Sequence, residues 1–108
     1  MPRPPGAGAL FCKRLRAARI AAGLSQKQLG IRSGIDPFVA STRINRYERG
    51  IHQADLQTAN RLAEVLGVPL AYLFAQDDRL ARMILAFRKM PRTQQEHLLD
   101  RLERPSSN

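Results

Sequence analysis

The residues best suited to chemistry are polar and basic side chains gathered in the segment STRINRYER, residues 41–49. We project this segment as a helix at 100° per residue, with Ile44 facing a core. Thr42 and Arg46 then point the opposite way, and Asn45 lies on the flank. In the major groove of DNA, arginine can pair with guanine O6 and N7, and asparagine with adenine N6 and N7. The segment therefore predicts a helix face that reads DNA bases. The alternative is a polar helix face that is simply exposed to solvent. The residues of the base-reading face are Ser41, Thr42, Asn45 and Arg46.

Two short helices joined by a turn are needed to present this face. Ser25 is a good N-cap because its hydroxyl can accept a hydrogen bond from a free backbone N–H, and about two helical turns follow it. Gly34 breaks that first helix. The second helix ends near Glu48, and Gly50 suits the left-handed position that closes a helix. The pattern predicts a helix-turn-helix over about residues 25–48.

An ordered set of residues extends the pattern on both sides of these two helices. The set is Leu15, Arg19, Gly23-Leu24-Ser25-Gln26, Leu29, Gly34, Ile44, Glu48-Arg49-Gly50, Leu62-Ala63, Leu66-Gly67-Val68 and Leu73. It resembles the phage-repressor/Cro type of helix-turn-helix domain, the Xre-like family of bacterial transcriptional regulators, over roughly residues 11–74. The resemblance implies a sequence-specific regulator of transcription that binds double-stranded DNA, and we expect a repressor.

The resemblance also implies roles for individual residues. In the family a charged pair links the first helix to the end of the recognition helix, so we expect a salt bridge between Arg19 and Glu48. The glutamine that opens the first helix of the motif touches a phosphate or supports the recognition helix in the family. The residues expected at the DNA backbone are Gln26, Lys27, Arg43, Arg49 and His52. For His52, a plain exposed loop histidine is an equally good interpretation.

The chain departs from the family pattern just before the second helix, where it is four residues longer, about one helical turn. Either the helix starts early, with Pro37 in its first turn, or residues 37–40 form a longer loop and the helix starts near Ser41. An early start would turn Phe38 and Val39 outward, where they would need thymine methyls or a second subunit as partners. We favour the longer loop, with Phe38 folded back on the body.

The whole chain is predicted to be all-α. Residues 1–9, rich in proline and glycine, are expected to be a disordered arm. Residues 10–75 are expected to form a five-helix, repressor-like domain whose first helix starts near residue 10. Residues 76–104 are expected to form two amphipathic helices, and residues 105–108 a frayed tail.

Those two added helices must bury their apolar faces, either on the same chain or on a second subunit. Helix-turn-helix proteins commonly read two half-sites one DNA turn apart, which requires a dimer. We therefore expect a homodimer built with residues 76–104. The alternative function is an antitoxin or adaptor whose C-terminal helices bind a protein partner, with DNA binding secondary.

The distribution of charge agrees with a DNA partner. The 108 residues carry a formal charge of +9. Residues 1–50 hold ten lysines and arginines against two acids, whereas residues 51–108 hold eight against seven. The positive potential therefore lies on the half that carries the helix pair, which favours a polyanion. In the first helix, Lys13, Arg14 and Arg16 lie off the apolar seam and could meet phosphates, although a solvated face fits them equally well.

Other classes of function find little support. No apolar run approaches the length of a membrane-spanning helix. A single cysteine, Cys12, fits a reducing cytoplasm. The resemblance implies a bacterial protein, which we expect to be associated with the nucleoid. His52 and His97 lack the spacing of metal ligands, and there is no glycine-rich phosphate loop. We therefore expect neither an enzyme nor a cofactor, metal or small-molecule ligand.

Overall fold

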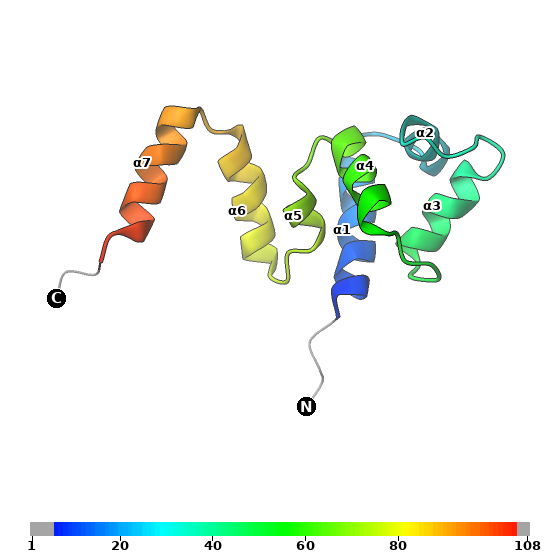
Figure 1. Cartoon of the computed structure of the whole chain (residues 1–108), viewed down its shortest axis with the longest axis horizontal. Coiled ribbons are helices and arrows are strands. Elements are labelled where there is room, and N and C mark those ends of the chain that lie inside the picture. The colour runs from blue at the N-terminus through cyan, green and yellow to red at the C-terminus, as the bar shows by residue number, and fades with distance from the viewer. Residues whose placement is uncertain (1–5, 106–108) are drawn as a thin grey trace.

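The computed structural model describes residues 6–105, and within that range the chain folds into α-helices without β-strands (Figure 1). The helices are α1 (Ala7–Ala21), α2 (Gln26–Arg32), α3 (Ala40–Glu48), α4 (Leu56–Leu66), α5 (Leu70–Leu73), α6 (Asp78–Lys89) and α7 (Arg92–Glu103). The predicted all-α fold class is confirmed. None of the helices in the described range is long and apolar enough to cross a membrane.

The centre of the core contains one fully buried large side chain from each of the first five helices. These side chains are Leu15, Leu29, Ile44, Leu62 and Leu73. Burying a leucine or isoleucine stabilises a fold by roughly 1.5–3 kcal/mol relative to leaving it exposed. Because each of α1 to α5 contributes one such residue, the five helices depend on one another for their stability. Helices α6 and α7 extend away from this body (Figure 1).

Helix α2 approaches α3 closely at Gly30, which is buried in the middle of α2. A Cβ atom built on Gly30 would lie 2.7 Å from the Cβ of Ala40 and 3.0 Å from its carbonyl oxygen. Real Cβ atoms do not approach other atoms so closely, so a glycine is required where the two helices meet. The sequence pattern indicated Gly34 as the break after α2 but gave no sign of the part played by Gly30.

One of the expected boundaries needs correction, and another is confirmed. Helix α1 begins at Ala7 with Gly6 as its N-cap, so the expected arm is at least three residues shorter than residues 1–9. Residues 1–5 and 106–108, which include most of the expected arm and tail, lie outside the described residues. Helix α3 begins at Ala40, one residue before the expected start, which confirms the longer loop.

The expected fold-back of Phe38 is wrong, because its side chain is 97% exposed. The reason lies in the turn before α3. The Asp36 carboxylate accepts a hydrogen bond from the backbone N–H of Phe38 at 2.8 Å, and the Asp36 carbonyl accepts one from Val39 at 3.0 Å. These bonds fix the backbone so that the ring is directed into solvent, although burial would otherwise favour the interior.

Arg14 is buried in the structure and does not face a phosphate. Its Nε and Nη2 atoms donate to the carbonyl of Ala75 at 3.3 and 2.9 Å, and Nη1 donates to Asp78 Oδ1 at 2.8 Å. The guanidinium carbon also lies 5.8 Å from the centre of the Tyr72 ring. Hydrogen bonds from Arg14 and Lys13 lower the pKa of Asp78 below its ordinary value. Arg14 therefore joins α1 to the junction of α5 and α6.

Replacing Gly30 with alanine should destabilise the protein by about 1–3 kcal/mol, since the added methyl overpacks the contact with Ala40. Gly8→Ala in α1 is the matched control, because a Cβ there would lie at an ordinary 3.7 Å from Gln53. In that helix alanine should be neutral or stabilising by up to about 1 kcal/mol. Urea unfolding of both variants measures the difference. Equal stability of the two variants would contradict the close approach.

Candidate nucleic-acid interface

Helix α3 divides into a buried face and an exposed face, as the projection predicted. Ala40 and Ile44 are fully buried, and Tyr47 is nearly so. Thr42 and Arg46 are exposed on the other side. The remaining residues of the expected base-reading set are Ser41, which is exposed, and Asn45, which is half-buried. The buried face fixes the helix on the core, and the exposed face presents hydrogen-bonding groups to solvent.

The end of α3 is fixed to α1 by the expected pair of Arg19 and Glu48. Arg19 Nε donates to Glu48 Oε2 at 2.6 Å and Nη2 donates to Oε1 at 3.1 Å, an arrangement with two parallel hydrogen bonds. The side chains are only 14% and 4% exposed. Arg19 Nη1 also donates to the carbonyl of Leu24 at 3.0 Å, in the turn before α2. The hydrogen bond to Glu48, with its charge, raises the pKa of Arg19 against the effect of burial.

Gln26 adds a third connection to the same carboxylate. Its Nε2 donates to Glu48 Oε1 at 3.3 Å, and its side chain is half-buried. Of the two roles that the resemblance implied, the structure therefore places this glutamine in support of α3.

Ser25 and Gln28 form a reciprocal capping box at the start of α2, with hydrogen bonds of 3.0 and 2.9 Å.

The loop after α3 returns to the exposed face of the helix. Arg46 Nη1 lies 3.5 Å from His52 Nε2, and the Arg46 carbonyl accepts the backbone N–H of Ile51 at 2.9 Å. Arg46 and His52 therefore share one patch, although the sequence suggested separate roles at a base and at the backbone. With other side chains they line a depression of about 480 Å³. Its remaining residues are Val39, Thr42, Arg43, Tyr47 and Gln53.

The other expected backbone residues lie on the surface. Lys27 lies exposed in the first turn of α2, Arg43 on α3, and Arg49 at the end of α3. None of them takes part in a salt bridge among the described residues. Their charges are thus free to meet a polyanion.

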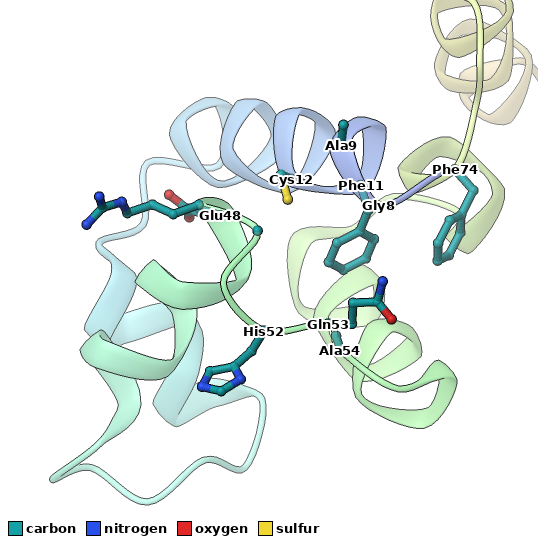
Figure 2. Close-up of a pocket in the computed structure, with 11 residues that line it drawn as sticks. Gly8, Ala9, Phe11, Cys12, Glu48, His52, Gln53, Ala54 and Phe74 are labelled. Atoms are coloured by element: carbon teal, nitrogen blue, oxygen red, sulfur yellow. The ribbon is translucent and has the colours of Figure 1, made fainter. Parts of the chain in front are cut away.

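A second cavity, of about 560 Å³, lies between α1 and the loop that follows α3, and it offers little chemistry (Figure 2). Figure 2 shows Phe11 and Phe74 on one side of it, with the His52 ring turned away from them. The two aromatic rings pack with centroids 5.3 Å apart. Glu48, which also borders the cavity, is already bonded to Arg19. Within residues 6–105 no three His, Cys, Asp or Glu side chains gather as metal ligands would.

Removing one partner of the buried pair should be costly. We expect Glu48→Ala to lose about 3–5 kcal/mol of unfolding free energy, because it leaves the Arg19 guanidinium without its carboxylate. Lys13→Ala is the control, since the Lys13–Asp78 pair is largely exposed, at 62% and 68%. Such surface pairs contribute little. Urea unfolding that gave both variants the same small loss would show that the buried pair does not hold α1 to α3.

Comparison with known proteins supplies independent evidence. A family model described as "Helix-turn-helix" matches residues 15–73. A search of curated proteins gives no significant match. Among solved structures, the chain is similar to the crystal structure of transcriptional regulator BswR, with a TM-score of 0.81 and 46% sequence identity, over 85% of this chain and 91% of that chain. The chain therefore belongs to the Xre/Cro-like helix-turn-helix family, whose model matches more than half of its length.

Proposed function

We propose that this protein is a transcriptional regulator that binds double-stranded DNA sequence-specifically and places α3 in the major groove. The observation that carries the proposal is the exposed face of α3, with Thr42 and Arg46 above a fully buried Ile44. A major groove about 12 Å wide admits a helix of this kind. The similarity to BswR, a transcriptional regulator, supports the same role. The proposed role is one of binding, without catalysis.

Base readout is assigned to Ser41, Thr42, Asn45 and Arg46. Arg46 is suited to guanine, because its guanidinium can donate to O6 and N7 together. His52, 3.5 Å from Arg46 Nη1, is assigned to the adjoining phosphate. The residues assigned to the DNA backbone are Lys27, Arg43, Arg49 and His52. Gln26 contributes through its bond to Glu48, and any contact of its own with a phosphate would be additional.

We further propose that the protein is a homodimer held by α6 and α7. None of the residues of α7 is buried, and within the described chain a side-chain hydrogen bond of 2.8 Å, from Gln95 Nε2 to the Phe87 carbonyl, ties α7 to α6. A 12-residue helix is marginal in water without packing. An apolar groove of about 680 Å³ lies between α4, α5, α6 and α7. Its apolar residues include Val68, Leu70, Ile84, Phe87, Leu98 and Leu102.

In the proposed dimer, a second copy of the chain would fill this groove. In a twofold dimer the same surface serves both partners, so the α7 residues left exposed in one copy could fill the groove of the other. Leu102, which is 63% exposed, is the clearest example. Helices α7 and α3 lie at opposite ends of the molecule, so the dimer would leave both copies of α3 free for DNA (Figure 1). We propose repression, in the bacterial cytoplasm on the nucleoid, as the outcome of such binding.

The alternative, an adaptor or antitoxin, uses the same groove for an unrelated protein. In that case the purified protein would remain a monomer, with the apolar groove unfilled. The oligomeric state of the purified protein therefore distinguishes the two functions.

Arg46→Ala should relax specificity at the base pair that Arg46 reads, by about 1–3 kcal/mol, because one paired contact is lost. Arg43→Ala should instead weaken binding to all duplexes alike and reduce the dependence on log salt by about one unit. Arg104→Ala, beyond α7, removes the same charge far from α3 and is the control. Mobility-shift titrations on a selected duplex and on mismatched duplexes at several salt concentrations separate these effects. An unchanged ratio of specific to mismatched binding in Arg46→Ala would refute its role in base readout.

Leu102→Asp should convert the dimer to a monomer, since dimerisation would bury the new carboxylate in an apolar groove. Thr93→Asp adds the same charge to the opposite side of α7 and should leave the dimer intact. Analytical ultracentrifugation of both variants and of the unaltered protein measures the effect. If the unaltered protein sediments as a monomer at micromolar concentration, the dimer proposal is wrong.

A further inference from the structure

The turn that leads into α3 displays an aromatic ring that the proposed set of DNA contacts does not include. Phe38 is 97% exposed, more than any other large apolar side chain among the described residues. Its neighbour Val39 is 42% exposed. Both residues lie in the turn between the end of α2 and the start of α3.

The ring is held outward by an ordered turn. The Asp36 side chain accepts the Phe38 N–H at 2.8 Å, and the Asp36 carbonyl accepts the Val39 N–H at 3.0 Å. Pro37 between them has a restricted backbone. An aspartate that bonds to the backbone two residues ahead is a recognised way of fixing a turn. Little conformational entropy therefore remains to be lost from this backbone when the ring meets a partner.

The turn continues the exposed face of α3 toward its N-terminus. Val39 is the N-cap of α3 and borders the same depression as Thr42 and Arg46. Residues three and seven positions apart lie on the same side of a helix, so Val39 aligns with Thr42 and Arg46. The apolar pair of Phe38 and Val39 thus adjoins the row of residues assigned to base readout.

We propose that Phe38, with Val39 beside it, contacts thymine 5-methyl groups in the major groove and so determines part of the sequence specificity. This inference rests on the proposed function. On the base edges of the major groove the thymine methyl is the apolar group, and phenylalanine is among the side chains that can pack on it. The contact would remove both the ring and the methyl from water. Because the ring is already exposed in the free protein, folding does not depend on it.

The experiment begins with selection of the preferred duplex from random sequences. Each thymine of that duplex is then replaced in turn by deoxyuridine, which differs only by lacking the 5-methyl group. The unaltered protein should lose affinity about threefold to fivefold at one thymine or a few thymines in each half-site, the effect of one buried methyl-sized group. Phe38→Ala should bind the thymine-containing duplex more weakly. Its affinity should not change when deoxyuridine replaces the thymines to which the unaltered protein is sensitive. Phe38→Leu should retain part of the sensitivity.

Ile20→Ala is the control, because it truncates another exposed apolar side chain, on α1, which belongs neither to the proposed DNA contacts nor to the proposed dimer helices. It should show the pattern of the unaltered protein, and Phe38→Ala should keep the same melting temperature. The inference is overturned if no thymine is sensitive, or if Phe38→Ala keeps the sensitivity. It is also overturned if Phe38→Ala changes the oligomeric state instead, since the ring would then face a second copy. If selection recovers no preferred duplex at all, the proposed function fails and this inference fails with it.

Discussion

The structure depends on one buried ion pair, between Arg19 of α1 and Glu48 at the end of α3. Arg19 also binds the Leu24 carbonyl, and Gln26 binds the same carboxylate, so α1, α2 and α3 meet at one point. The favourable attraction in such a pair is largely offset by the loss of hydration, so its contribution is orientation more than stability. A helix that reads base edges must be held in one position, because misplaced hydrogen-bonding groups give no discrimination.

The rest of the domain keeps the apolar side chains buried and leaves the exposed face of α3 open to solvent. Five large side chains, one from each of α1 to α5, form the centre of the core, and Ile44 is the contribution of α3. The close approach at Gly30 sets α2 directly against α3. With its inner side occupied in this way, α3 can carry Thr42 and Arg46 outward without weakening the core. Arg14 also makes the domain more rigid, because its hydrogen bonds join α1 to the start of α6.

Much of this could be predicted from the sequence because it depends on local rules. The cap at Ser25, the left-handed Gly50 that follows α3 and the inward position of Glu48 follow from backbone geometry and helical periodicity. What could not be predicted depends on contacts between segments far apart in the chain. Nothing in the neighbourhood of Arg14 shows that its partners lie more than 60 residues away, at Ala75 and Asp78. The exposure of Phe38 could not be predicted from the average burial of phenylalanine, because the hydrogen-bonded turn overrides that tendency.

The most direct test of DNA reading by α3 is a map of the DNA-bound surface by nuclear magnetic resonance of the labelled protein on its selected duplex. We predict that the largest chemical-shift changes fall on α3, the turn before it and the loop after it, with α6 and α7 little affected by DNA. Changes concentrated on α6 and α7, with Asn45 and Arg46 unaffected, would contradict the central claim that the exposed face of α3 is the surface that reads DNA.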